Sequence, residues 1–196
     1  MRERVPLTAV HEAVLEFLSR VNDAVLFGAQ AVNAYVEEPR MTENVDVLSP
    51  RARELAEQLT RFLRERLHIA ARVREIGQGR GYRVFQVRKP KNRHLVDIRP
   101  VTALPPAKRI GGILVVTPEE LIAEKVMAYH CRKGHPKSGT DWRDLAMLLL
   151  TFPKLKKKDS LVLDRLRAAD ADEAVVATWH ELVAQEIKPP QEDDEF

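Results

Sequence analysis

The sequence has a single cysteine and no long apolar run. Cys131 is the only cysteine among the 196 residues, so an intramolecular disulfide is excluded. No stretch approaches the roughly 20 consecutive apolar residues that a membrane-spanning helix needs, and the N-terminal residues do not resemble a signal peptide. From these absences we expect a cytoplasmic protein without membrane contact, long enough to bury a good core.

The net charge is only +3, but the charge is unevenly distributed along the chain. The stretch from Arg51 to Arg99 holds 14 Lys or Arg against 5 Asp or Glu. Such a basic stretch suits a triphosphate or a nucleic-acid backbone. The alternative is a solvated helix face that happens to be rich in arginine.

A turn of small residues starts at Gly28. Residues 24–27 are apolar and indicate a short buried strand, and residues 29–36 have the spacing of a helix. The start of a helix offers unpaired backbone N–H groups to an anion. We therefore expect a strand, a tight turn and a helix that could hold a phosphate.

A pair of polar residues, Asn44 and Asp46, begins sixteen positions after Gly28. Asn44 and Asp46 lie two positions apart, so on a strand their side chains point the same way while Val45 and Val47 face the core. On a strand, this spacing would bring two oxygen ligands close enough to bind the same ion.

The remaining pattern indicates an α+β protein in which helices flank a mixed sheet and a helical lobe follows. Apolar spacing predicts helices over residues 8–21, 50–67 and 118–131, further helices near 161–166 and 174–187, and strands over 71–76, 81–88, 94–99 and 113–116. Two prolines and two glycines in residues 104–112 favour a lobe boundary there. We therefore predict a core over residues 1–104, a strand and helical lobe over 105–187, and a disordered acidic tail over 188–196.

The order Gly28, Ala29, Arg40, Thr42, Asn44, Asp46 resembles the nucleotidyltransferase superfamily of DNA polymerase β, in particular its AbiEii/AbiGii-type toxin branch. The family pattern is a Gly-Gly or Gly-Ser pair, a short helix, and Arg-x-Thr-x-Asp-x-Asp. Two later pieces match the same branch: Lys125 followed by Ala128, and a helix that carries Asp141 and Asp144. Together these pieces cover roughly residues 24–150.

The resemblance implies a polymerase-β-like nucleotidyltransferase fold and a role for each matching residue. Mg²⁺ or Mn²⁺ would be held by Asn44, Asp46 and Asp97, the last in the place of the family's third carboxylate. Catalytic roles would fall to Asp46, Asp97, Lys125 and Asp144. The NTP would be bound by Gly28, Ala29, Arg40, Thr42 and Lys125. The implied partners are an NTP, an acceptor such as RNA or the tRNA acceptor end, and a cognate antitoxin.

Asn44 departs from the pattern because an amide stands where the first catalytic carboxylate would be. An amide offers a neutral oxygen and no negative charge, so metal affinity should drop. Two hypotheses follow: a metal-dependent nucleotidyltransferase, or a catalytically inactive member that binds nucleotide, RNA or a protein partner. An α+β scaffold without a nucleotide site is a third.

Several of these residues also have an ordinary structural explanation. Asp97 could form a salt bridge with Arg83 or Arg99, and Arg40 could brace its loop through Glu37 or Glu43. Lys125 could be a solvated helix lysine. Asp141 and Asp144 could be acids that favour the start of a helix.

His130, Cys131 and His135 are close in sequence but match no zinc-ligand spacing. We assign them no metal.

Overall fold

The structure is a computed structural model that describes residues 5–189. Of the tail predicted to be disordered, residues 188–196, all but the first two lie outside the described residues. The chain divides into two compact units, Met1–Ala34 with Glu38–Thr117, and Tyr35–Glu37 with Pro118–Phe196. The boundary predicted from the sequence at residues 104–105 precedes this division and stays a prediction.

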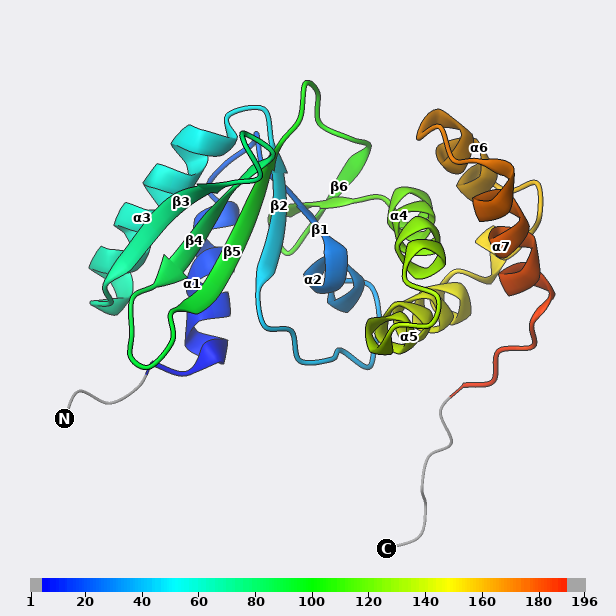
Figure 1. The fold of residues 1–196 in the computed structure, drawn as a ribbon, viewed down its shortest axis with the longest axis horizontal. Coiled ribbons are helices and arrows are strands. Elements are labelled where there is room, and N and C mark those ends of the chain that lie inside the picture. The colour runs from blue at the N-terminus through cyan, green and yellow to red at the C-terminus, as the bar shows by residue number, and fades with distance from the viewer. Residues whose placement is uncertain (1–4, 190–196) are drawn as a thin grey trace, which may run out of the picture. The chain divides into compact units, whose positions relative to one another are not determined.

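The first unit is built on a mixed sheet of seven strands in the order β3-β4-β5-β2-β1-β7-β6 (Figure 1). Two neighbouring pairs, β2 with β5 and β1 with β7, are parallel, and the other pairs are antiparallel. This confirms the predicted α+β class with a mixed sheet. The strands are β1 (Val25–Phe27), β2 (Val45–Ser49), β3 (Ala71–Ile76), β4 (Gly81–Gln86), β5 (Arg93–Pro100), β6 (Ala107–Ile110) and β7 (Ile113–Val116).

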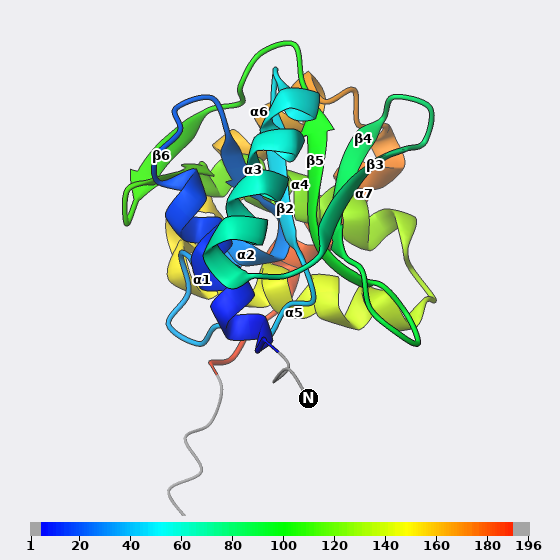
Figure 2. The ribbon, with the colours of Figure 1, turned by 90° about the vertical axis from the view of Figure 1, so that its left-hand side faces the viewer.

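Two amphipathic helices, α1 (Leu7–Leu18) and α3 (Ala52–Leu67), lie on the same face of this sheet (Figures 1 and 2). Both bury an apolar stripe, and the rings of Phe17 and Phe62 meet with centroids 5.5 Å apart between them. The alternation along β2 buries Val45 and Val47 completely. Asp46 between them therefore points to the opposite face of the sheet.

A short helix, α2 (Gly28–Asn33), follows β1 without an intervening loop. It corresponds to the helix predicted over 29–36, but it ends three residues earlier. The predicted strands and long helices of this unit are all present within a few residues. Strand β6 was not predicted: it lies in the Pro- and Gly-rich stretch interpreted as a lobe boundary, and it pairs with β7 as a hairpin.

The second unit is helical. Its elements are α4 (Pro118–Cys131), α5 (Pro136–Thr151), the 3₁₀ turn η1 (Pro153–Leu155), α6 (Leu161–Ala168) and α7 (Glu173–Ala184). Trp179 is fully buried and α4 packs against α5, α6 and α7. Tyr35 joins this unit through an edge-to-face contact with Phe152, with ring centroids 5.4 Å apart.

Within residues 5–189, no helix is long and apolar enough to cross a membrane.

Candidate active site

Two carboxylates from separate segments of the chain meet on the face of the sheet that points away from α1 and α3. Strands β2 and β5 are parallel, and Asp46 pairs with Asp97 in their register. Residues paired in this way point to the same face of a sheet. The two acids are therefore direct neighbours, as the resemblance implied.

The turn at Gly28 approaches one of these acids closely. Gly28 has a φ of +68°, and a Cβ placed on it would lie 2.9 Å from Asp46 Oδ2. A side chain at this position would combine a left-handed backbone with a steric clash. The absence of a side chain thus lets the start of α2 lie directly beside the carboxylate.

Asn44 lies beside the same acid from within β2's own segment. Its Nδ2 donates a hydrogen bond of 3.3 Å to Asp46 Oδ1. Turning the amide by 180° would exchange its nitrogen and oxygen and would point Oδ1 toward the carboxylate side. Asn44 is therefore a donor to Asp46 as the amide stands, and with the amide turned it would be a neutral oxygen ligand beside that acid.

Asp97 already has a cationic partner. Arg83 on β4 donates from Nε to Asp97 Oδ1 and from Nη2 to Oδ2, each over 2.9 Å. Such a bidentate pair is among the stronger hydrogen-bonded arrangements. The salt bridge that the sequence left open as an alternative is thus formed, with Arg83 as the partner.

His94 is the second group at Asp97. A bulge between β4 and β5, where Val84 pairs with Val96 but Phe85 pairs with His94, turns His94 onto the face that carries Asp97. His94 Nε2 lies 2.9 Å from Asp97 Oδ1, although the pair lacks the alignment of a hydrogen bond.

These contacts set the protonation of Asp97. Burial by itself raises the pKa of this carboxyl, but His94 and the two hydrogen bonds from Arg83 outweigh burial and lower the pKa to about 2. Asp97 is therefore ionised at neutral pH and is neutralised by protein groups.

The resemblance implies a divalent cation, and the donor set tests whether one fits. Within residues 5–189, no group of three or more His, Cys, Asp or Glu is arranged to hold a metal ion. What the site offers is two adjacent carboxylates and an amide. Each carboxylate has about four lone-pair positions, and at Asp97 two of them accept hydrogen bonds from Arg83. Carboxylate and amide oxygens are the ligand type that a hard cation takes, so the donor set suits such an ion.

Side chains of α2 fix the loop that leads into β2. Gln30 Nε2 donates to Thr42 Oγ1 over 2.7 Å. Asn33 Nδ2 donates to the carbonyl of Arg40 over 2.8 Å, and the Arg40 N–H donates to Asn33 Oδ1 over 3.0 Å. Thr42 is buried, so within this unit Arg40 and Thr42 are held by their backbone and hydroxyl groups.

Lys125 and Asp144 lie together in the second unit. Lys125 Nζ donates to Asp144 Oδ2 over 2.7 Å and lies 3.8 Å from Asp141 Oδ1, while Arg132 Nη1 donates to Asp141 Oδ2 over 2.7 Å. Lys125, Asp141 and Asp144 are all buried. The interpretation of Lys125 as a solvated lysine is therefore wrong, because α4 and α5 enclose it with two acids.

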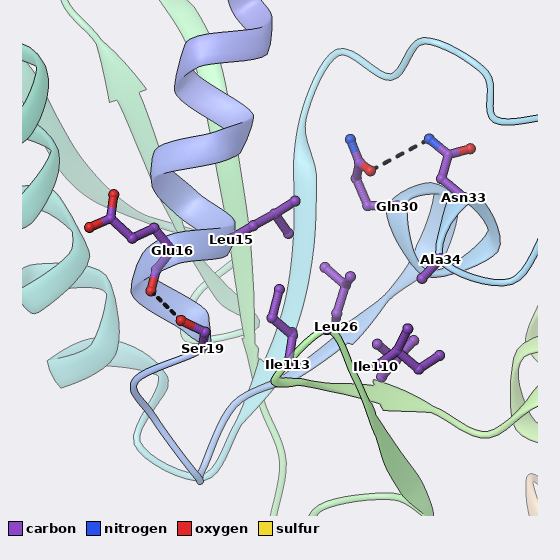
Figure 3. Close-up of a pocket in the computed structure, with 11 residues that line it drawn as sticks. Leu15, Glu16, Ser19, Leu26, Gln30, Asn33, Ala34, Ile110 and Ile113 are labelled. Atoms are coloured by element: carbon purple, nitrogen blue, oxygen red, sulfur yellow. Dashed lines mark hydrogen bonds between the residues drawn. The ribbon is translucent and has the colours of Figure 1, made fainter.

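A pocket of about 460 Å³ opens elsewhere in the first unit, between α1, α2 and the β6–β7 hairpin (Figure 3). Its wall is mainly apolar and includes Leu15, Leu26, Ile110 and Ile113. Leu26 faces the α1 side of the sheet, since it pairs with Val47. This side of the sheet is opposite Asp46. The pocket is lined by Gln30 and Asn33 of α2 as well, but by none of the residues predicted for the site.

Sequence reasoning missed three residues of the site: Gln30, Asn33 and His94. The polar positions of α2 carried a weak signal, because Gln30 and Asn33 are three apart and share one helix face. His94 carried none, since its direction depends on the bulge.

A comparison of the sequence with known protein families supports the same interpretation as the arrangement of the two acids. The family model described as "Nucleotidyl transferase AbiEii toxin, Type IV TA system" matches residues 16–195. No curated protein matches the chain.

Two solved structures share the fold at low sequence identity. The Megavirus polyadenylate synthase is 15% identical with a TM-score of 0.61, over 79% of this chain and 33% of that protein, so the chain spans about a third of its length. JHP933 from Helicobacter pylori is 19% identical with a TM-score of 0.54, over 90% of this chain and 87% of that protein. The fold is thus polymerase-β-like, as predicted.

Proposed function

The chain belongs to the AbiEii family of nucleotidyl transferase toxins of type IV toxin–antitoxin systems, and from this premise we propose that it transfers a nucleotidyl group from an NTP to a hydroxyl of RNA. It is a nucleotidyltransferase-like protein, and its family generally uses divalent metal ions and implies an NTP substrate and an antitoxin partner. The observation that carries the proposal is the pairing of Asp46 with Asp97 beside Gly28.

In this proposal Asp46, Asp97 and Asn44 hold Mg²⁺ or Mn²⁺. Such an ion, when bound, neutralises charge on the phosphates and on the leaving pyrophosphate. Asp46 and Asp97 supply the negative charge, part of which Arg83 offsets at Asp97, and Asn44 is neutral. Arg83 in turn adds a fixed positive charge on the same face of the sheet.

The other predicted residues bind and orient the nucleotide. Backbone N–H groups at Gly28 and Ala29 would hold phosphate oxygens, and the loop with Arg40 and Thr42 would be kept in place by α2. Lys125 Nζ has three donors and gives one to Asp144, and with Asp141 3.8 Å away it would offer a further donor to a phosphate. Asp144 would hold this ammonium group in position.

The test is incubation of the purified chain with each of four α-labelled NTPs, total RNA and Mg²⁺ or Mn²⁺. We expect label in RNA with at least one NTP, loss of transfer in Asp46→Asn, and faster transfer in Asn44→Asp because a carboxylate is restored. Asp164→Asn, at an exposed acid of α6, is the matched control and should transfer label as the wild type does. Absence of label under every condition would count against the proposal.

The second candidate is a catalytically silent member that binds nucleotide or RNA. Two observations favour it: an amide stands at residue 44, and Arg83 neutralises Asp97. Calorimetric titration with NTP and Mg²⁺ separates the two candidates. Saturable binding without transfer supports the silent member, and transfer gained in Asn44→Asp identifies residue 44 as the cause.

A further inference from the structure

A second pocket, of about 360 Å³, lies where the loop between β4 and β5 meets the start of β5. Its volume falls within the range of about 300–1,000 Å³ typical of ligand sites. The side chains of Arg88, Lys91, Arg93 and His94 line it together with Glu43. Three permanent cations thus face one acid among the described residues of its wall, a balance that favours an anion.

The cationic side chains of this pocket form few ion pairs with acids among the described residues. Within residues 5–189, no hydrogen-bond or ion-pair partner is found for the side chains of Arg88 and Lys91. Arg93 Nη1 donates to the neutral carbonyl of Val5 over 3.0 Å, and no acid among the described residues forms an ion pair with Arg93. Burial lowers the pKa of Arg93, and the nearby charge of Arg88 lowers this pKa further. An anion in the pocket would relieve this repulsion.

His94 connects the pocket to the candidate active site. It lines the pocket, and its Nε2 lies 2.9 Å from Asp97 Oδ1. A ligand in the pocket is therefore one side chain away from the acids. The strand order β4-β5-β2-β1 places the pocket and Gly28 on opposite sides of the two acids. Gly28 follows β1, and Asp46 and Asp97 lie on β2 and β5. The pocket lies at the β4–β5 loop.

Beside the pocket, the face of the sheet that carries His94 also carries arginine and aromatic side chains suited to binding a polynucleotide. Arg72 pairs with Phe85 and Phe85 pairs with His94, so these three side chains share one face. Arg74 lies over the Phe85 ring, 5.7 Å from its centroid. Aromatic rings flanked by cations are the elements with which proteins hold single-stranded nucleic acids.

We propose that the pocket of Arg88, Lys91, Arg93 and His94 binds a backbone phosphate of the acceptor polynucleotide. This inference rests on the proposed function, because it assigns the acceptor to one side of Asp97 and the NTP to the Gly28 side. A triphosphate has the same phosphate chemistry, so the experiment measures RNA and NTP separately.

The experiment measures binding of a short fluorescent single-stranded RNA to the full chain, without NTP or metal, over a series of salt concentrations. The variant is Arg88→Gln with Lys91→Gln, and the control is Arg61→Gln with Lys137→Gln, which removes the same charge at exposed positions of α3 and α5. We expect the Kd to rise at least about tenfold in the variant and its salt dependence to fall by about one to two in log–log slope. The control should bind nearly as the wild type does.

The second measurement is NTP binding with Mn²⁺ in the same proteins, which we expect to be unchanged in the variant. The inference is overturned if wild-type chain does not bind RNA, if variant and control lose RNA affinity equally, or if the variant loses NTP affinity instead. RNA binding that depends on the pocket, without nucleotide transfer, would leave this inference standing and contradict the proposed function. A melting temperature equal to that of the wild type shows that the variant is folded.

Discussion

Arg83 and Asp97 face each other across β4 and β5 and are joined by two parallel hydrogen bonds of 2.9 Å. The relationship matters because Asp97 is one of only two carboxylates that the predicted metal site retains. A divalent cation at this site has to share Asp97 with a guanidinium group. The site therefore combines two carboxylates with a neutral amide at residue 44 and a guanidinium group at Asp97.

Replacing Arg83 by Gln should destabilise the fold and strengthen cation binding. The partly buried carboxylate of Asp97 would lose its bidentate partner, which costs about 1–3 kcal/mol. Mn²⁺ affinity should increase because a competing charge is gone. Urea unfolding and Mn²⁺ titration measure the two effects, and Arg61→Gln on the exposed face of α3 should change stability by less than about 0.5 kcal/mol. Unchanged stability in Arg83→Gln would mean that the pair is not formed.

Stability should depend on pH through Asp97. Its folded-state pKa of about 2 lies below the ordinary value of 3.8, so its contribution is present above the ordinary value and is lost as the pH falls toward 2. The loss amounts to about 2 kcal/mol. Unfolding curves measured from about pH 5 to about pH 2 should show a flatter profile for Asp97→Asn than for the wild type. Parallel profiles would contradict the depressed pKa.

Replacing Gly28 by Ala adds a single methyl group, yet it should lower both the stability of the fold and the affinity of the site for its ligands. The left-handed backbone costs an L-residue about 1–2 kcal/mol, and the new methyl would displace Asp46 Oδ2, which lies 2.9 Å away. We expect lower stability and weaker NTP and Mn²⁺ binding. Gly139→Ala is the matched control, since nothing lies near its added Cβ in α5 and helix propensity should make it neutral or stabilising.

The pair of Lys125 and Asp144 should prove essential for the stability of the second unit. Removing one partner of a buried ion pair typically costs about 3–5 kcal/mol, so Lys125→Met and Asp144→Leu should each unfold more easily. The double variant should recover part of the loss, because two apolar groups replace two charges. If the double variant regains stability but not nucleotide transfer, the pair has a role beyond packing. Recovery of both would restrict the pair to structure.

Much of the fold could be predicted because its signals are local. The helix at Pro118–Cys131 was predicted at both ends, since Thr117 and Pro118 mark its start and the apolar spacing carries it to Cys131. The helix predicted to carry Asp141 and Asp144 starts at Pro136, because proline suits the first position of a helix. Strand β6 was missed because its exposed Lys108 and Arg109 carry no alternation of burial.

The site was predictable only in part because its contacts depend on register. Asp46 could be placed from the alternation of β2, but its pairing with Asp97 depends on the parallel join of β2 to β5. The direction of His94 follows from the bulge. Trp142 is 40% exposed although Leu145 on the same helix is fully buried, because Trp142 lies on the outer side of α5. Such outcomes are set by the partners of a residue and leave no periodic pattern in the sequence.

The measurement that tests the central claim most directly is a Mn²⁺ titration of three proteins: the wild type, Asp46→Asn and Asn44→Asp. The electron paramagnetic resonance signal of unbound Mn²⁺ reports the binding. If a cation is held by the acids beside Gly28, Asp46→Asn should weaken binding at least about tenfold and Asn44→Asp should tighten it by a similar factor, about 1.4 kcal/mol each. Equal Kd values in all three proteins would contradict a cation site at Asp46 and Asp97.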